Sequence, residues 1–515
     1  MKPFIPGKVI SSLGFVLMIG SFGCTSGTTS KTTEKKLTRP NILWIVADDL
    51  GTDLGCYGDS LVYTPNLDKL SHEGVRYINF YTVTAVCSPS RSTLITGMYP
   101  VSIEAHQHRT RHKKPLPEGI EPITKYFREA GYFTCNGDFR NSEKPGKTDY
   151  NFVADSIFDG TDWSQREDGQ PFFAQIQIYY PHRPFLRDTL HPVDQARVKL
   201  PPYYPDHWIT RQDWALYLET IQILDIEVGK IMKRLEKENL LDNTIIFFFG
   251  DQGRPHVRAK QFMYDGGIHT PLIIRLPGKI SSQRNDEVII SWEWPAKYKK
   301  SGVNNDLVSN VDLAVVSLYL AGIEIPEHLQ GMNFLDPKAQ KRDYVFSMRD
   351  RRDETVDRIR TIRTKDFKYI RNFYPERPYT QFNAYKKQAY PVLTLMQIMH
   401  ENDELTQIQE IFMANNRPVE ELYDLNQDPW EVNNLSGKED YEETLLNLRS
   451  LMDSVLLKYD KGIYPETKKE IEFAEKLMKD RFKKQMENKG LSEKSTDEEI
   501  LEYWKSYLTP TPLRK

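Results

Sequence analysis

Long apolar runs alternate along the chain with segments whose apolar residues recur at helical spacing. Residues 41–47 and 244–249 are almost wholly apolar, and residues 172–179 and 272–276 form two further short apolar runs. Runs of this length are typical of strands that are buried on both faces of a parallel sheet. We therefore predict a sheet whose central strands are hidden from water.

Three segments between or after these runs have the pattern of helices. Residues 64–70 begin with a Thr–Pro pair suited to a helix start, residues 216–235 carry apolar residues at helical spacing, and residues 307–320 form a third segment. Strands that alternate with helices indicate an α/β fold with a doubly wound, mostly parallel sheet flanked by helices. Ligands of such sheets bind beyond the carboxyl ends of the strands.

The pattern changes after about residue 340. Residues 358–371 alternate apolar and charged side chains, as antiparallel strands with one solvated face do, and residues 437–515 are charged and mostly helical in pattern. We expect a large catalytic α/β domain over residues 39–340. A smaller α+β subdomain, with antiparallel strands and a charged helical extension, is expected over residues 341–515.

The N-terminal segment is predicted to direct export. Two lysines precede a short apolar run, Leu13–Ile19, which is followed by Gly23 and Cys24, and the run is too short to span a bilayer. The Gly–Cys pair resembles a bacterial lipoprotein cleavage site. We therefore expect a signal peptide over residues 1–24, a lipid tether on Cys24, a flexible linker over residues 25–38, and a location in the periplasm or outer membrane. Plain secretion is the alternative.

Composition narrows the function classes. The chain has 515 residues and a net charge of −3, with basic and acidic residues nearly balanced. Such a balance, without long basic runs, gives no sign of nucleic-acid binding. The length suffices for one large α/β domain and a smaller one.

The most specific segment for chemistry is the stretch from Cys87 to Gly97. The cysteine is followed by Pro89 and Arg91, and a Thr–Gly pair closes the stretch. A short helix opened by proline and closed by glycine would put Cys87 just before a helix N-terminus, where backbone amides favour an anion. Arg91 could then brace a bound anion. A buried structural cysteine in an unrelated α/β binding protein is the alternative interpretation.

Three predicted strands end in polar residues. Asp48 and Asp49 follow one strand, Asp251 and Gln252 follow a second, and His182 follows a third. Carboxylate and amide oxygens that converge at one edge of a sheet suit a hard cation such as Ca²⁺ or Mg²⁺. Turn or helix-cap chemistry is the alternative for the two adjacent aspartates.

Over about residues 39–436 these segments together resemble the type I sulfatases of the alkaline phosphatase superfamily, with some similarity to sulfamidase-like and iduronate-sulfatase-like members. The resemblance implies that a maturation enzyme oxidises Cys87 to formylglycine (3-oxoalanine), whose hydrated aldehyde is the nucleophile. It also implies a bound Ca²⁺, with Mg²⁺ as the alternative, held by Asp48, Asp49, Asp251, Gln252 and one oxygen of the modified residue 87. Gln252 stands where the family usually carries Asn or His.

The resemblance also assigns the remaining site residues. Lys260, four residues before Tyr264, is expected to bind the sulfate and to assist the leaving oxygen, and His182 is a candidate general acid or sulfate donor. Lys147 matches the family's lysine, whereas Asp149 stands where a histidine partner is usual. A basic rim for an anionic glycan is expected from six further residues: His106, His108, Arg109, Arg254, His256 and Arg258.

We therefore expect a sulfatase that hydrolyses sulfate esters, or N-sulfates, of a sulfated oligosaccharide or glycosaminoglycan-type substrate. Two rivals remain. One is a phosphoester or phosphonate hydrolase of the same superfamily, and the other is a catalytically inactive glycan-binding homologue. The sugar, the sulfate position and the oligomeric state are not fixed by these patterns.

Overall fold

The computed structural model describes residues 39–277, 280–284, 287–292, 302–462, 464 and 466–509. The predicted signal peptide, the linker and Cys24 lie outside the described residues. Thr38–Lys515 forms one compact unit, which contains both of the sheets described below.

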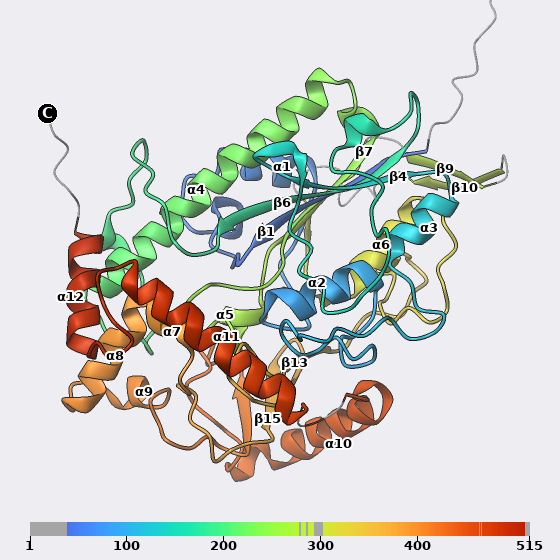
Figure 1. Cartoon of the computed structure of the whole chain (residues 1–515). Helices are drawn as coiled ribbons and strands as arrows, with labels where there is room; N and C mark the ends of the chain where they lie inside the picture. The colour runs from blue at the N-terminus through green and yellow to red at the C-terminus, as the bar shows by residue number, and fades with distance from the viewer. Residues whose placement is uncertain are drawn as a thin grey trace, which may run out of the picture. The chain divides into compact units, whose positions relative to one another are not determined.

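An eight-stranded sheet forms the centre of this unit (Figure 1). In spatial order its strands are β11 (Gly302–Asn304), β2 (Val75–Tyr77), β8 (Leu272–Arg275), β7 (Thr244–Gly250), β1 (Asn41–Asp48), β6 (Phe172–Pro181), β4 (Phe133–Asp138) and β5 (Asn141–Pro145). The four central strands β7, β1, β6 and β4 are parallel to one another, whereas the flanking strands β8 and β5 are antiparallel to β7 and β4. The predicted mostly parallel α/β sheet is confirmed.

Alternate residues of β1 enter two different hydrophobic cores. Leu43 and Ile45 belong to one buried cluster, and Trp44 and Val46 belong to another. All four side chains are at most 1% exposed. Because a strand presents successive side chains to opposite faces, an uninterrupted apolar run is the sequence of a strand covered on both sides.

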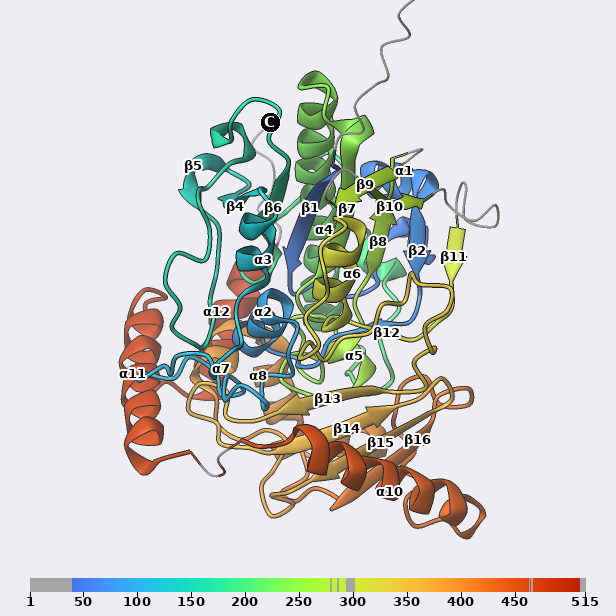
Figure 2. The ribbon, with the colours of Figure 1, turned by 90° about the vertical axis from the view of Figure 1, so that its right-hand side faces the viewer.

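Helices cover both faces of the sheet (Figure 2). One face carries α1 (Pro65–Glu73) and α4 (Trp208–Lys237), and the other carries α2 (Cys87–Thr96), α3 (Ile123–Glu129) and α6 (Asp312–Leu320). Helix α6 begins later than expected, because Val308–Ser309 forms β12 and pairs in parallel with β3 (Phe80–Tyr81).

A second sheet lies below the first in Figure 2. Its antiparallel strands are β13 (Val345–Arg349), β14 (Ile359–Arg363), β15 (Phe367–Asn372) and β16 (Glu420–Asp424). The expected solvated face is wrong. Arg360 and Lys368 are fully buried, because Asp350 and Asp460 neutralise the arginine and Glu431 neutralises the lysine.

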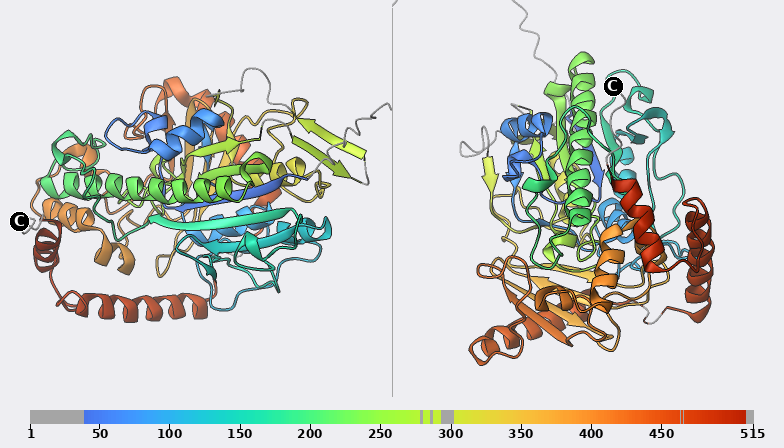
Figure 3. Two further views of the ribbon diagram at one scale, coloured as in Figure 1. Left: turned by 90° about the horizontal axis from the view of Figure 1, so that it is seen from above. Right: turned by 90° about the vertical axis from the view of Figure 1, so that its left-hand side faces the viewer.

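The other elements connect or extend these sheets. They are the hairpin β9 (Ile280–Arg284) and β10 (Glu287–Trp292), and the helices α5 (Asp265–Ile268), α7 (Ala384–Ala389), α8 (Pro391–Glu401), α9 (Gln407–Glu410), α10 (Glu442–Tyr459), α11 (Lys468–Glu487) and α12 (Asp497–Leu508). In the left panel of Figure 3, α11 lies at one edge, with β6 between it and α4. Within the described residues, no helix combines the length and the apolar character needed to cross a membrane.

Candidate active site

Four of the predicted metal ligands meet at the carboxyl ends of β1 and β7. These strands are adjacent and parallel, so Asp48 and Asp49 lie beside Asp251 and Gln252. The amide of Asp49 donates to Asp251 Oδ1 at 3.0 Å. Asp49 has a left-handed backbone, with φ of 68°, a conformation that aspartate tolerates better than most residues. The turn therefore holds two adjacent carboxylates at one sheet edge.

Cys87 lies against these acids from the other side. It is the first residue of α2 and not, as expected, the residue before the helix. Its Sγ lies 3.5 Å from Asp48 Oδ1 and 3.4 Å from Gln252 Nε2. Ligand atoms of Asp48, Cys87 and Asp251 all lie within 4.8 Å of one another. The helix start thus presents residue 87 to the acidic cluster.

Three cations, of which Arg91 and Lys260 are buried, neutralise the three carboxylates. Arg91, one turn into α2, donates from Nε to Asp251 Oδ2 at 3.0 Å. Lys147 Nζ donates to Asp48 Oδ2 at 2.7 Å. Lys260 Nζ donates to both carboxylate oxygens of its aspartate partner, Asp49, at 2.8 and 2.6 Å, and lies 3.8 Å from the sulfur of residue 87.

Burial and neighbouring charges divide the acids into two kinds. Burial raises the pKa of Asp48, but the charges of Lys147 and Arg91 outweigh burial and hold that pKa well below its ordinary value. Burial and the negative charge of Asp48 together raise the pKa of Asp251 to about 7. Two carboxylates this close do not both ionise easily. The site therefore has room for additional positive charge.

His182 follows β6 and faces the same cluster. Its Nε2 lies 3.8 Å from Asp49 Oδ2. Its Nδ1 lies 2.6 Å from the carbonyl of Arg183, and because a carbonyl only accepts, Nδ1 carries the proton. Burial, together with the charge of Lys260, lowers the pKa of His182 to about 4. At neutral pH the imidazole is therefore uncharged, and Nε2 is a proton acceptor.

The donor set fits a hard divalent cation. Asp48, Asp49, Asp251 and Gln252 offer carboxylate and amide oxygens as ligands, and all four residues are at most 2% exposed. The Oε1 atom of Gln252 is buried and has no hydrogen-bond partner within the described part of the chain. Oxygen-rich sites of this kind suit Ca²⁺ or Mg²⁺. A buried oxygen that accepts no hydrogen bond is free to coordinate a cation, so Gln252 Oε1 can serve as an additional ligand.

A cavity of about 1100 Å³ opens over this cluster. Among the residues expected from the sequence, Asp48, Cys87, Lys147, His182 and Arg109 line it. The remaining predicted residues lie directly behind this lining and contact one another or residue 87. They are Asp49, Arg91, Asp251, Gln252 and Lys260. The structure therefore brings together the predicted catalytic and metal-binding residues.

The expected basic rim is largely absent from the cavity. Arg254 pairs with Asp53, with Nε 2.6 Å from Oδ2. His256 is buried against the aromatic rings of Trp214 and Tyr217, at centroid distances of 4.3 and 4.8 Å. Arg258 lies over the ring of Tyr264 and donates to the carbonyl of Trp430 at 2.9 Å. These three side chains are turned into the protein and do not line the cavity, because each has partners there.

Of the other three residues of the expected basic rim, two are buried and one lines the cavity. His106 is buried with its ring 5.2 Å from that of Tyr464, and His108 is fully buried with Nδ1 3.1 Å from Asp353. Arg109 alone reaches the cavity.

Asp149, at the position where a histidine partner is usual, makes two hydrogen bonds with Arg109 at 2.9 and 2.8 Å. It therefore orients the arginine at the cavity.

Sequence reasoning missed several residues of the cavity. Tyr385 of α7 has its hydroxyl 3.4 Å from His182 Nε2, and Arg352 and Asp353 line the wall after β13. Nε of Arg352 and Oδ2 of Asp353 are buried without a hydrogen-bond partner among the described residues. No motif marks these positions, because their role depends on how the second sheet packs against the first.

Comparison with known proteins assigns the family. Residues 40–323, more than half of the chain, match the family model described as Sulfatase. The chain belongs to the sulfatase family. Residues 287–415 of this sulfatase match a second model, described as N-sulphoglucosamine sulphohydrolase, C-terminal. The resemblance drawn from the motifs is confirmed, and the protein is a sulfuric ester hydrolase.

Relatives agree with this assignment. An ulvan-active sulfatase of Formosa agariphila is 33% identical over 479 residues, which cover 82% of this chain and 76% of the relative. An N-acetylglucosamine-6-O-sulfatase of Bacteroides thetaiotaomicron is 23% identical, with 85% of this chain and 90% of the relative covered. Among solved structures, BT4656 in complex with its substrate D-glucosamine-2-N,6-O-disulfate has a TM-score of 0.56 at 20% identity, covering 82% of this chain and 98% of that chain.

Proposed function

We propose that this sulfatase removes sulfate from a sulfated glycan, using formylglycine formed from Cys87 and a bound divalent cation. The observation that carries the proposal is the position of residue 87. It begins a helix at the cavity, 3.5 Å from an acid of the candidate cation site and 3.8 Å from the ammonium of Lys260.

An unmodified cysteine does not suit catalysis at this position. Burial raises the pKa of Cys87 to about 12. The thiolate is the reactive form of cysteine, so a thiol with this pKa is largely inert near neutral pH. Formylglycine at residue 87 would instead supply a hydrated aldehyde as the nucleophile toward sulfur.

Asp48, Asp49, Asp251 and Gln252 would hold the cation, for which Ca²⁺ is our first candidate and Mg²⁺ the second. When bound, the cation would supply Lewis-acid charge beside the sulfate oxygens. Lys147, which lines the cavity, and Lys260, directly behind its lining, would add positive charge. Such preorganised charge stabilises the negative oxygens of a transition state.

His182 is suited to take a proton at residue 87. The carbonyl of Arg183 holds the proton of the imidazole on Nδ1, and the uncharged Nε2 faces the acidic cluster. A proton acceptor that lines the same cavity as the nucleophile can serve as its general base. We therefore favour this role for His182 over that of a general acid.

The substrate class follows from the relatives and from the cavity. Relatives that align over most of this chain are named for activity on ulvan and on N-acetylglucosamine-6-O-sulfate. A cavity of about 1100 Å³ is large enough for more than one sugar ring. We propose a sulfated oligosaccharide as the substrate, with ulvan oligosaccharides as the first to test.

Two measurements test the proposal. Mass spectrometry of the peptide that spans residue 87, from protein made together with a formylglycine-generating enzyme, should give the mass of an aldehyde at this position. Ion chromatography should then detect sulfate released from ulvan or glycosaminoglycan oligosaccharides, and the Cys87→Ala variant should release none. Modified protein that hydrolyses phosphonate or phosphoester analogues but no sulfate would establish the phosphonate hydrolase rival, and unmodified protein that only binds glycan would establish the inactive homologue.

We further propose that the protein is exported and tethered through Cys24. The support is the arrangement of a basic start, a short apolar run and a Gly–Cys pair. Expression of the full chain should give protein in the membrane fraction, and Cys24→Ser should release it into the soluble periplasmic fraction. Equal distribution of both proteins would contradict the tether.

A further inference from the structure

The cavity over residue 87 extends to the C-terminal helices α11 and α12. The residues of these helices that line its far wall include Arg481, Phe482, Lys484, Tyr503, Trp504 and Tyr507. Both helices lie beyond residues 40–323 and 287–415, which the two family models match. The far wall therefore lies outside the regions that the two family models match.

Helix α7 connects this wall with the reacting end of the cavity. Tyr385 of α7 lies beside His182, and Gln388 of the same helix offers its carbonyl to Lys489, just after α11. Tyr385 and Gln388 both line the cavity. A ligand that starts at His182 and follows α7 therefore arrives at α11 without leaving the cavity.

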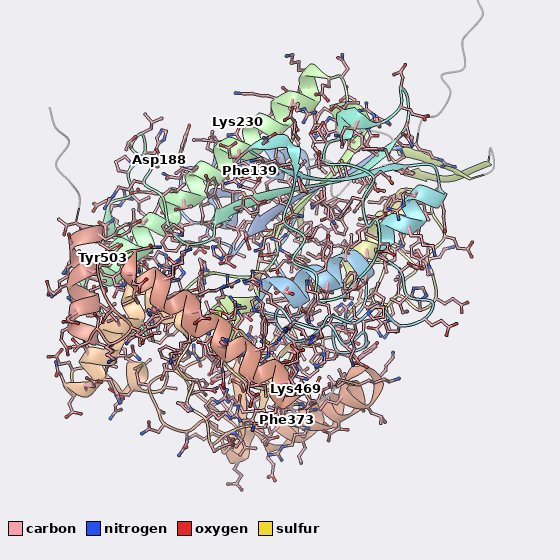
Figure 4. The ribbon with its side chains drawn as sticks, in the orientation of Figure 1. Phe139, Asp188, Lys230, Phe373, Lys469 and Tyr503 are labelled. Atoms are coloured by element: carbon pink, nitrogen blue, oxygen red, sulfur yellow. The ribbon has the colours of Figure 1, made fainter. Side chains whose placement is uncertain are left out.

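The wall is anchored at both ends. At the start of α11, Glu470 accepts a hydrogen bond from the amide of Arg111 at 2.9 Å. At the end of α12, Arg187 donates to the carbonyl of Leu508 at 2.8 Å. In Figure 4 the labelled Lys469 and Tyr503 mark α11 near its start and α12. Anchored helices position their side chains more closely than a loose tail does.

The two basic residues of the wall differ from the other cavity arginines. Arg109 and Arg183 are occupied by Asp149 and Asp213. Arg481 and Lys484 are exposed, and neither forms an ion pair with any residue that the structure describes. Their charges are therefore available to an anion that enters the cavity.

Aromatic side chains line the same wall of the cavity. Tyr507 is 49% exposed and packs edge-on against Trp504, with ring centroids 5.4 Å apart. The ammonium of Lys489 lies 4.2 Å from the ring of Trp504. Aromatic faces pack against apolar C–H surfaces while their edges stay hydrated. A sugar that bears sulfate or carboxylate groups can pack its C–H face against an aromatic ring while a nearby cation binds its acidic group.

We propose that α11 and α12 form a distal subsite for an anionic sugar of the substrate chain, separate from the sugar whose sulfate meets residue 87. Arg481 and Lys484 bind its acidic group, and Tyr507 packs against its ring. The inference rests on the proposed glycan substrate, and it makes the protein an enzyme that prefers oligosaccharides to single sulfated sugars.

Binding to a non-turnover protein tests the subsite. Calorimetry would use the full chain with Cys87→Ala, an ulvan tetrasaccharide, a glycosaminoglycan tetrasaccharide, and the monosaccharide D-glucosamine-2-N,6-O-disulfate. Arg481→Ala with Lys484→Ala should weaken binding of at least one tetrasaccharide by about tenfold, the effect of two exposed ion pairs. Monosaccharide binding should change less than twofold, and Tyr507→Ala should show the same selectivity.

The matched control is Lys479→Ala with Lys483→Ala, which removes two exposed charges from the same helix outside the cavity lining. It should leave both affinities unchanged. Equal weakening by both double variants, an equal loss for the monosaccharide, no loss, or no tetrasaccharide binding would each overturn the subsite. Because calorimetry does not depend on turnover, absence of sulfate release from the protein that carries formylglycine at residue 87 would refute the hydrolase proposal, while selective tetrasaccharide binding would still support the subsite.

Discussion

Arg91 is expected to be the residue of the site whose loss destabilises the fold most clearly. Its guanidinium is 3% exposed and contacts Asp251 at 2.9 Å. It also donates to Gln177 Oε1 at 2.5 Å. The variant Arg91→Met keeps most of the buried volume but removes the cationic partner of Asp251 and the donor to Gln177 Oε1. Removing one partner of a buried ion pair costs about 3–5 kcal/mol.

The size of the protein converts this cost into a temperature. The compact unit Thr38–Lys515 has about 480 residues, for which the entropy of unfolding is about 1 kcal/mol per kelvin. The melting temperature of Arg91→Met should therefore fall by about 3–5 °C. Arg91→Lys should lose less than Arg91→Met, because lysine keeps the charge but not the forked geometry of the guanidinium.

Differential scanning calorimetry at one scan rate, with EGTA present, would measure these changes. Arg140→Met is the control, because this arginine is 59% exposed in its ion pair with Asp138 and such pairs contribute about 0–1 kcal/mol. With Ca²⁺ at saturation the cost of Arg91→Met should shrink, because the cation neutralises the same acids. A loss below about 1 °C in EGTA, or a loss that grows with Ca²⁺, would refute the reasoning.

Three further predictions concern the cation, the sulfate and pH. Ca²⁺ at a hundred times its Kd should stabilise the protein by about 2.7 kcal/mol and so raise its melting temperature by about 3 °C. In a thermal scan, Asp251→Asn should lose most of this increase in melting temperature. An undiminished increase would exclude Asp251 as a ligand. Lys260→Met should reduce sulfate release at least 100-fold, the effect of about one lost charged donor in a buried site, and Lys260→Arg should not restore it because the position is fully buried. Burial, with Arg183 and Arg254, holds the pKa of His256 well below its ordinary value, so stability falls as pH drops below about 6.5, where only the unfolded chain takes up the proton. His256→Phe should flatten this fall between pH 7 and 5 and leave sulfate release unchanged; a large loss of activity would contradict its position away from the cavity.

The parts of the fold that could be predicted are those with a local signal. Apolar runs such as 41–47 identify strands covered on both faces, and polar residues directly after them identify the functional sheet edge. The motif around Cys87 and the segment around Lys260 needed no tertiary information. Each of these signals is carried by neighbouring residues in the sequence.

The parts that could not be predicted depend on partners far away in the chain. The sequence alone predicts Arg254 and Arg258 as surface charges. In the fold, Arg254 pairs with Asp53 and Arg258 packs over the ring of Tyr264, so both side chains point into the protein. The charged positions of β14 and β15 predict a solvated face in the sequence. In the fold they are buried, and acids from other segments neutralise their charges. The sequence shows that a residue is charged, but only the fold shows whether that charge already has a partner.

Charge balance relates the cation, the substrate and the distal subsite. Around residue 87 three buried acids are matched by Arg91, Lys147 and Lys260, so the protein alone offers little net attraction to an anion. A divalent cation would leave this end of the cavity positive, which a sulfate group could then offset. At the far wall, Arg481 and Lys484 have no acids to neutralise them among the described residues, so they attract an anion without any cation. Removing Ca²⁺ should therefore abolish binding of a single sulfated sugar while leaving part of the tetrasaccharide affinity, and calorimetry with and without EGTA would detect this difference.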